Sequence, residues 1–332
     1  MAYAQYADTP TLHVYADTVQ LPILVLGPDQ RSIKPIAASR FSLSFDGGPW
    51  FRVSHTRPEG NDPISLSILL DLNGGAAYLM PKMEKVLGEL ALDQLRAGDR
   101  ISIYGLRCSL MRSVEDVPAD QETVRRGVED ILSLGNDEKK AEQAGRCVRT
   151  AGLWDALAFV ANASRTQHGQ RVILVVTDGN AENGKNSAKT LGQVKAFAQG
   201  NGVSVFGLVQ NGALGSYDLQ RWQAQERFRV FCEMTGGMVF ESGEWQVKST
   251  LRRFVTVLRG RYIVEFPRPY NMSRGAHSLM VKIDEGGNFF VRPAGISVPL
   301  PDAAKRSDPM TVPIDPAKTP EMGRQKTPAP EP

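Results

Sequence analysis

Two aspartates directly follow the two most apolar segments of the chain. Asp71 comes after "ISLSILL" (residues 64–70), and Asp178 comes after "RVILVVT" (residues 171–177). In a parallel sheet, ligands bind in the crevice beyond the carboxyl ends of the strands. Two carboxylates at that edge suit a hard divalent cation, which prefers oxygen ligands, or acid–base chemistry. The alternative is structural: Asp71 caps the following helix and Asp178 accepts backbone amides in its own loop.

The residues around these aspartates limit the chemistry. The turn "DLNGG" supplies the amide of Asn73 and two glycines, but no second carboxylate two residues after the first. No phosphate-binding glycine motif follows a strand, and no nucleophile–base pair is evident. The four histidines lack the spacing of zinc ligands. An enzyme that transfers phosphoryl groups with a metal is therefore the least favoured reading.

The middle of the chain alternates between strand and helix patterns. Apolar runs predict strands at residues 64–70, 100–106, 171–177, 203–209 and 238–241. Helical periodicity predicts helices at residues 81–95, 121–134, 153–163, 188–199, 217–235 and 245–259. This alternation is typical of a doubly wound α/β domain with a mostly parallel sheet buried on both faces.

The two flanks of this region are rich in strand patterns. Residues 12–57 and 261–299 show short β-like runs separated by Pro, Gly and Asp, with "EGGN" as an expected hairpin turn. Lone hairpins are marginally stable, so we expect the flanks to pair into one small discontinuous β-sandwich. Eight of the 32 residues from Pro301 onward are proline, which predicts a disordered tail. We therefore expect an α/β domain at residues 64–260 and a sandwich formed by residues 11–60 and 261–300. Residues 1–10 precede these domains, and residues 301–332 form the proline-rich tail.

Composition excludes several classes of protein. The net charge of the 332 residues is +3, too balanced for a nucleic-acid surface. No run of eighteen apolar residues predicts a membrane span. Ala2-Tyr3-Ala4 has the form of a signal-peptidase site, so residues 1–10 are a signal-peptide remnant or disordered, and the protein is expected to be exported. Chance is the alternative, since alanine is common.

Between residues 64 and 260 the chain resembles the von Willebrand factor type A family. The resemblance rests on the strand that ends in Asp71 and on "VILVVTDG", "GLWDAL" and "EMTGGMVFE". The β-rich flanks resemble bacterial exported proteins of this family. The resemblance implies a doubly wound α/β fold and a role in binding proteins. Family members build a metal-ion-dependent adhesion site from D-x-S-x-S, a threonine and an aspartate, and a partner carboxylate completes it.

This sequence departs from that motif. Asp71 and Asp178 match the two aspartates, but Asn73 and Gly75 stand where serines belong. Thr150 lies one residue before the expected threonine position. The resemblance therefore implies a degenerate site in which Asp71, Asn73 and Asp178 hold Mg²⁺ or Mn²⁺ weakly, with no metal as the equal alternative. It also implies Gly75, Thr150 and Asn180 as partner-binding residues.

The family layout places Cys108 and Cys147 at the rim near this site. They form either a disulfide or two free thiols, whereas Cys232 is a small helix residue of the core. The charged segment 136–146 is expected to be a solvated loop, with a recognition loop as the alternative. Trp154, Trp222 and Trp245 are expected to pack in the core or between helices.

These observations predict a non-enzymatic, exported protein-interaction module, for adhesion or as a scaffold. The alternative is a structural component of a larger cell-envelope assembly. The expected partner is another protein, engaged through an acidic side chain. Nucleic acid is not expected, and homo-oligomerisation stays open.

Overall fold

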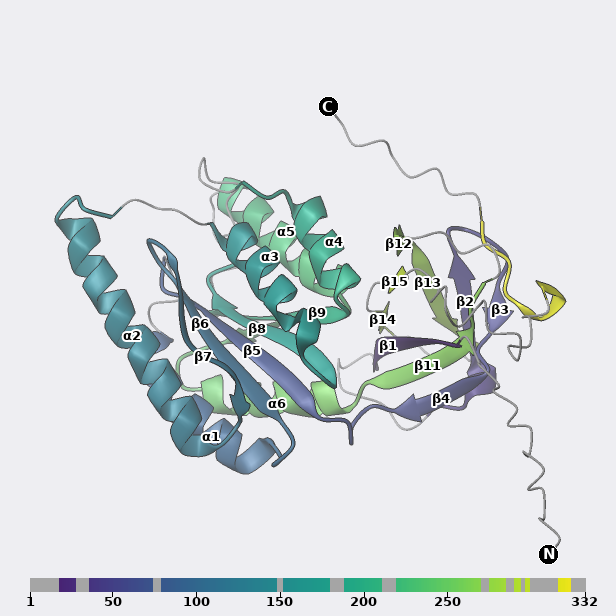
Figure 1. Cartoon of the computed structure of the whole chain (residues 1–332), viewed down its shortest axis with the longest axis horizontal. Helices are drawn as coiled ribbons and strands as arrows, with labels where there is room; N and C mark the ends of the chain where they lie inside the picture. Colours follow the sequence, from purple (N-terminus) through teal and green to yellow (C-terminus); the bar gives the residue numbers. More distant parts are fainter. Residues whose placement is uncertain are drawn as a thin grey trace, which may run out of the picture.

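A six-stranded sheet forms the centre of the helix-containing domain in the computed structural model (Figure 1). The structure describes residues 18–27, 36–73, 79–147, 152–179, 188–210, 219–269, 275–284, 290–293, 296–298 and 316–323. The sheet has the order β10-β9-β8-β5-β6-β7, and only β7 runs antiparallel to its neighbour. Its strands are β5 (Ile64–Asp71), β6 (Arg100–Leu106), β7 (Leu110–Pro118), β8 (Gln170–Thr177), β9 (Val203–Gln210) and β10 (Val239–Ser242).

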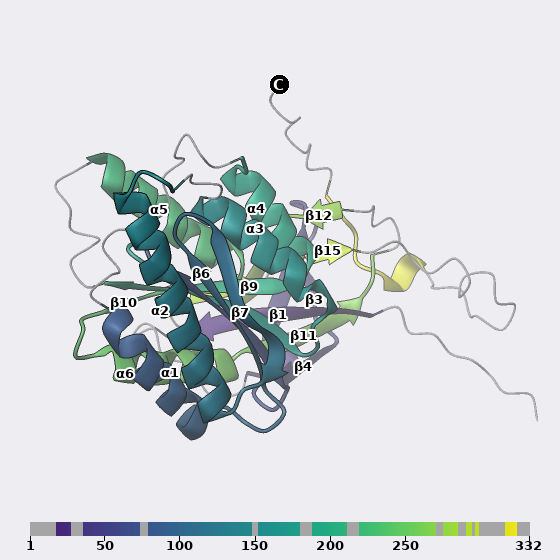
Figure 2. The same cartoon turned by 60° about the vertical axis from the view of Figure 1, so that its left-hand side comes forward.

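Helices cover both faces of this sheet (Figure 2). One face packs against α1 (Met80–Gln94), α2 (Gln121–Gln143) and α6 (Val247–Arg259). The other packs against α3 (Leu153–Ala163), which η3 (Ser164–Thr166) follows, α4 (Leu191–Gly200) and α5 (Leu219–Met234). Successive residues of a strand point to opposite faces, so β5 sends Ile68 to the first layer and Leu69 to the second. The predicted fold class is therefore confirmed. Among the described helices, none is long and apolar enough to cross a membrane.

Two elements of the α/β domain differ from the sequence-based expectation. Strand β7 was not predicted, because its residues "LMRSVEDVP" combine charges with only a weak alternation. As the sheet's edge strand it needs few apolar residues, and its pairing with β6 is irregular, which protects an open edge. The segment 136–146 is mostly not a loop, because α2 continues to Gln143. Its Glu, Lys, Ala and Gln residues are good helix formers.

The flanks pair with each other to form the second domain. One sheet has the order β14-β1-β11-β4, from β1 (Thr18–Leu26), β4 (His55–Pro58), β11 (Tyr262–Pro267) and β14 (Phe290–Pro293). The other has the order β13-β2-β3, from β2 (Phe41–Phe45), β3 (Phe51–Arg52) and β13 (Leu279–Ile283), with η1 (Ala38–Arg40) before β2. A further ribbon pairs β12 (Gly275–His277) with β15 (Ile296–Val298). The strands on either side of "EGGN" were expected to pair as a hairpin. This prediction is wrong, because β13 and β14 belong to different sheets.

Strand β1 joins the two domains through its alternating faces. Leu21, Ile23 and Val25 lie in the sandwich core, whereas Leu24 and Leu26 belong to the core of the α/β domain. The chain also crosses between the domains twice, after β4 and after α6, and an ion pair between Glu59 and Arg261 links the two crossings. The domains therefore share packed side chains.

Part of the proline-rich tail is ordered against the sandwich. Residues 316–323 contain a 3₁₀ turn, η5 (Pro316–Lys318), and a parallel bridge between Met322 and Phe45. The expectation of disorder is wrong for these residues, since the apolar Met322 packs on the sandwich core. The expected signal remnant at residues 1–10 lies outside the described residues.

The three tryptophans that were expected to pack in the core or between helices have different environments. Trp154 is buried against Phe231, as expected. Trp222 is 47% exposed and Trp245 is 88% exposed, so the expectation of packing between helices is wrong for these two. Trp245 instead lies under the Lys82 ammonium, with Nζ 3.7 Å from the ring centroid.

Candidate binding site at the carboxyl edge of the sheet

The strand order of the sheet reverses between β5 and β8. Numbered along the chain, the six strands have the order 3-2-1-4-5-6, which places the switch point between the first and the fourth. Asp71 ends β5 and Asp178 follows β8, whose Val176 pairs with Leu70. The structure thus brings Asp71, Asn73 and Asp178 to the place where doubly wound sheets bind ligands. The expected partner-binding residues Gly75, Thr150 and Asn180 lie outside the described residues.

The Asp71 carboxylate is 5% exposed and accepts three protein hydrogen bonds. Thr177 Oγ1 donates to Oδ2 over 2.8 Å. The backbone N and the Nδ2 of Asn73 donate to Oδ1 over 3.1 and 3.3 Å. Asp71 does not cap the next helix, which begins at Met80 after Leu79. Thr177 was missed by the sequence analysis, although its place immediately before Asp178 was visible.

Burial is the main influence on the charge of Asp71. Burial raises the pKa of the carboxyl, and the nearby Asp178 adds a smaller rise, so that with all influences together the pKa moves from 3.8 to about 6. The hydrogen bonds from Thr177 and Asn73 lower the pKa, but they do not cancel the effect of burial. Asp71 is therefore mostly ionised at neutral pH and neutral in mild acid.

The amide of Asn73 faces the carboxylate with its nitrogen. Its Nδ2 lies 3.3 Å from Asp71 Oδ1, from the carbonyl oxygen of Leu106 and from that of Arg107. Three acceptors around one atom assign it as the donor, because the opposite orientation would place oxygen against oxygen. A cation shared by Asp71 and the amide oxygen does not fit this arrangement. Within the described part of the chain, no group of three or more His, Cys, Asp or Glu side chains could hold a metal ion.

Asp178 is also buried, and its main chain is fixed from α5. Gln225 Nε2 donates to the Asp178 carbonyl oxygen over 2.8 Å. Gly179 follows in the left-handed region, with φ of 72°, and its N–H donates to Thr177 Oγ1 over 3.3 Å. A side chain at Gly179 would come within 3.2 Å of Gln225. The turn at Asp178 and Gly179, where the chain leaves β8, therefore packs against the buried side-chain amide of Gln225.

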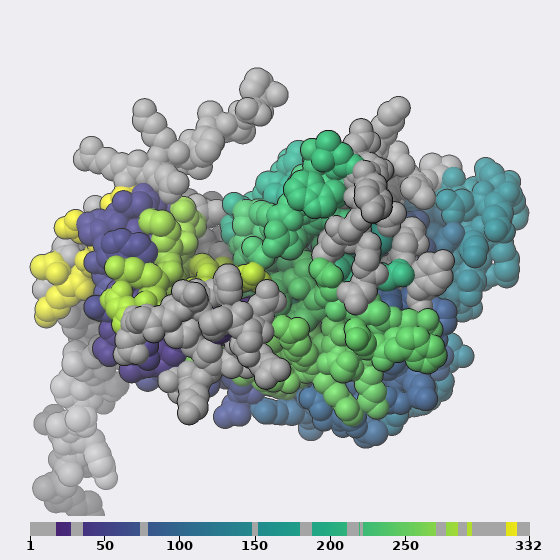
Figure 3. Space-filling view, turned by 180° about the vertical axis from the view of Figure 1, so that it is seen from behind, coloured from purple at the N-terminus to yellow at the C-terminus, as the bar shows by residue number. Residues whose placement is uncertain are grey.

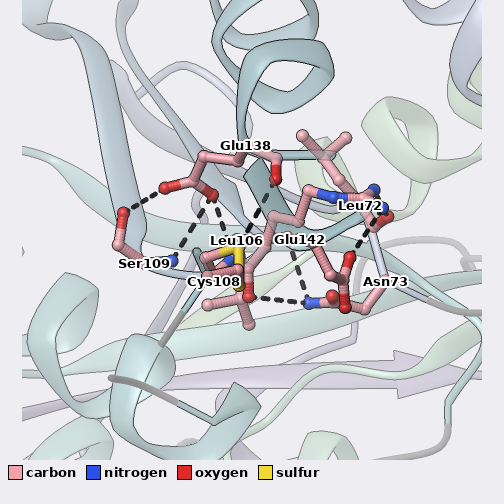
Figure 4. Close-up of a disulfide and its surroundings, with 9 residues drawn as sticks. Leu72, Asn73, Leu106, Cys108, Ser109, Glu138 and Glu142 are labelled. Atoms are coloured by element: carbon pink, nitrogen blue, oxygen red, sulfur yellow. Dashed lines mark hydrogen bonds and ion pairs between the residues drawn. A yellow bond between two sulfur atoms is a disulfide. The ribbon is translucent and has the colours of Figure 1, made fainter. Parts of the chain in front are cut away.

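The turn between β6 and β7 forms the neighbouring rim, and Glu138 of α2 holds it (Figure 4). The Glu138 carboxylate accepts from the N–H of Cys108 over 2.9 Å and from the hydroxyl of Ser109. It also accepts the N–H of Ser109 over 3.4 Å. One side chain of the helical extension therefore satisfies three donors of the turn.

Arg107 connects this turn to the end of β5. Its Nη1 donates to the carbonyl oxygen of Leu72 over 2.9 Å, and its Nη2 pairs with Glu142 Oε2 over 3.0 Å. Gly135 allows α2 to pass close to Leu72, because a Cβ there would lie 2.2 Å from Leu72 Cδ1. The exit of β5, the rim turn and the end of α2 therefore form one connected network, which we call the rim network.

A disulfide joins Cys108 of the turn to Cys147 after α2. Their Cα atoms are 5.8 Å apart and 39 positions separate them in the sequence. This distance lies in the usual range for the bond. The structure thus brings the expected pair together, and Cys232 is a buried free thiol of the core. The bond ties the end of α2 to the turn that Glu138 and Arg107 also hold.

The strand order, the helix layers and this edge define a doubly wound α/β domain with polar residues at its switch point, which is the fold that the resemblance to the von Willebrand factor type A family implies. The structure is similar to the vWF domain of the type V pili tip protein Mfa5 from Porphyromonas gingivalis, at 8% identity and a TM-score of 0.42, over 59% of this chain and 95% of that one. It is also similar to a von Willebrand factor type A protein from Catenulispora acidiphila, at 12% identity and a TM-score of 0.42, over 85% of this chain and 74% of that one.

A third similar structure is the pilus adhesin SpaC from Lactobacillus rhamnosus GG in its open conformation. The identity is 8% and the TM-score 0.43, over 82% of this chain and 47% of that one. No family model matches the sequence, and no curated protein matches it. At these values the likeness is distant, and the assignment of the fold rests on the strand order and the helix layers described above.

Asp71→Asn is expected to stabilise the protein in a pH-dependent way. Between about pH 4 and about pH 6 the folded state holds a proton on Asp71 that the unfolded state has lost. The free energy of unfolding of the wild type therefore falls as the pH rises through this window, by at most about 3 kcal/mol, and is level above it. The variant lacks this loss. Denaturant unfolding of both proteins near pH 4 and above pH 7 measures the gain in stability of the variant over the wild type. A gain that is the same at both pH values would contradict the prediction.

Proposed function

We propose that this chain is a protein-interaction module that engages its partner at the carboxyl edge of the six-stranded sheet. The observation that carries the proposal is the rim network, which fixes this edge from β5, β6 and α2 with a disulfide and hydrogen bonds. A surface that is already ordered loses less conformational entropy when a partner binds. The switch point beside it is where this class of sheet binds its ligands.

We propose further that binding does not need a divalent cation. Asp71 already accepts hydrogen bonds at both carboxylate oxygens, and Asn73 presents donors rather than an oxygen. Protein donors thus take the role that a cation has in a metal-ion-dependent adhesion site. Weak binding of Mg²⁺ or Mn²⁺ by Asp71, Asn73 and Asp178 remains the competing proposal, and the experiment below separates the two.

The charge of the exposed rim supports a partner that offers an acidic side chain. Lys139 and Arg146 are exposed at the end of α2, and Lys140 is paired with the exposed Asp137, while Glu138 and Glu142 turn their carboxylates to the rim turn and to Arg107. The disulfide supports an exported protein, because such bonds persist in oxidising compartments. If the chain is instead a structural component of an envelope assembly, we propose that it contacts the other components through this same edge.

Site-specific photo-crosslinking of the full chain tests the proposal. A crosslinking residue replaces Lys139 in one variant and Arg165 in the other, both exposed basic positions. Arg165 lies after α3, near the start of β8, and therefore at the opposite edge of the sheet. We expect envelope extracts to give a protein adduct at 139 that is absent at 165 and unchanged by EDTA. Equal adducts at both positions would contradict the interface, and loss of the adduct in EDTA would contradict metal independence.

A further inference from the structure

The ordered part of the tail occupies a corner of the sandwich that binds a short segment through one parallel bridge. At this corner, β2 ends at Phe45 and the chain turns through Asp46, Gly47 and Gly48 (residues 45–48, the acceptor corner). The Phe45 carbonyl oxygen accepts two N–H groups, that of Gly48 over 2.7 Å and that of Gly323 over 3.0 Å. In the space-filling view the yellow tail segment lies on the purple strands of the sandwich (Figure 3).

Two glycines make this contact possible. A Cβ on Gly48 would lie 2.4 Å from the backbone N of Gly323, and a Cβ on Gly323 would lie 2.1 Å from the carbonyl oxygen of Asp46. Neither glycine has a positive φ, so their lack of a side chain is what the contact requires. The acceptor corner therefore selects an incoming segment that carries glycine at this one position.

Met322 gives the contact an apolar anchor. It forms the parallel bridge to Phe45 and packs on the sandwich core. Phe45, Phe51 and Phe266 form an aromatic group there, with ring centroids 5.3 to 5.8 Å apart. Methionine adapts well to such surfaces. A Met-Gly step in an extended segment thus matches the corner in shape, polarity and hydrogen bonding.

The tail is connected to the sandwich by a long stretch of sequence. Between Val298, where β15 ends, and Pro316, where η5 begins, there are 316 − 298 − 1 = 17 residues. Fully extended, they span at most about 60 Å. Such a connection lets the segment reach its own corner or that of a neighbouring copy, and the contacts are identical in both cases. Exchange of an identical element between copies is a low-cost route to association.

We propose that the acceptor corner is a binding site for the segment 319–323 and that this segment links copies of the chain when it leaves its own corner. The partner is a second copy, because the Met-Gly step that fits the corner is present in every copy. One side chain and one hydrogen bond give weak affinity, with a Kd on the order of 0.1–1 mM. A tethered segment has an effective concentration in the millimolar range, at or above this Kd, so most dilute wild-type chains fill their own corner.

A complementation experiment with two full-length variants tests this proposal. Gly323→Val disables the segment and leaves the corner free, whereas Gly48→Val disables the corner and leaves the segment free. Sedimentation at about 0.5 mM chain, near the expected Kd, should show each variant alone as a monomer. It should show a complex of twice that mass in the equal mixture. The matched control mixes Gly323→Val with the doubly substituted chain, which has neither function and should not associate.

Hydrogen exchange of the Gly323 amide gives the second readout. In the dilute wild type this amide should exchange several-fold more slowly than in Gly48→Val, where it should exchange as fast as in a free peptide. Equal exchange rates of Gly323 in the wild type and in Gly48→Val would overturn the site itself. A protected Gly323 with no complex in the mixture would overturn the linking of copies. If thermal melting shows that Gly48→Val is unfolded, Gly48→Ala and Met322→Asp replace the pair with smaller disturbances.

Discussion

Replacement of Cys108 and Cys147 together by serine is expected to lower the free energy of unfolding by about 4 kcal/mol. The disulfide closes a loop of 39 residues, and the loop-closure entropy that it removes from the unfolded chain corresponds to this amount. Chemical denaturation of the oxidised wild type and of the double variant measures the difference. The same substitution should speed amide exchange in the last turns of α2, because Glu138 and Glu142 lose the covalent tie beside them.

A reductant provides the matched control for this prediction. It should lower the stability of the wild type to that of the variant and leave the variant unchanged. Cys232 is buried in the core, and burial raises the pKa of its thiol, so it does not take part in this response. A wild type whose stability is insensitive to reductant would show that Cys108 and Cys147 are free thiols.

Glu59→Gln is expected to destabilise the protein by about 3–5 kcal/mol, because it leaves the Arg261 guanidinium buried without its counter-charge. Both side chains are almost fully buried, and Arg261 Nε lies 3.0 Å from Glu59 Oε2. The N–H is not directed at that oxygen, so the contact is an ion pair rather than a hydrogen bond. Burial raises the pKa of the Glu59 carboxyl, and the charge of Arg261 opposes this shift.

The double variant Glu59→Met/Arg261→Met separates the charge from the packing. Since apolar replacements of a buried ion pair are often neutral, it should recover most of the stability lost in Glu59→Gln. Glu244→Gln, which removes a partner of the exposed pair with Lys82, is the control and should change stability by less than about 1 kcal/mol. A Glu59→Gln variant as stable as this control would contradict the prediction.

The position of Glu59 and Arg261 also predicts how the protein unfolds. The two residues lie on the two chain connections between the domains, and β1 contributes to both cores. We therefore expect one cooperative transition rather than two.

The sequence by itself determined the layered α/β domain and the position of the two aspartates of the candidate site. Uninterrupted apolar runs such as residues 172–176 are typical of strands buried on both faces, so such apolar runs identified the core strands. Because Asp71 and Asp178 follow two of these strands directly, their place at the carboxyl edge was a consequence of the strands themselves. The pairing of the two flanks followed from the instability of lone hairpins.

Only the tertiary structure decided which side chains meet at that edge and what covers the sandwich. Thr177 donates to Asp71 from another strand, and Glu138 reaches the rim turn only because α2 continues past residue 134. Strand β13 pairs with β2 instead of β14, and Gly323 contacts Gly48 across 275 positions. Local periodicity reports how each segment is buried, whereas these contacts depend on which segments the fold brings together, and no pattern within either segment records that.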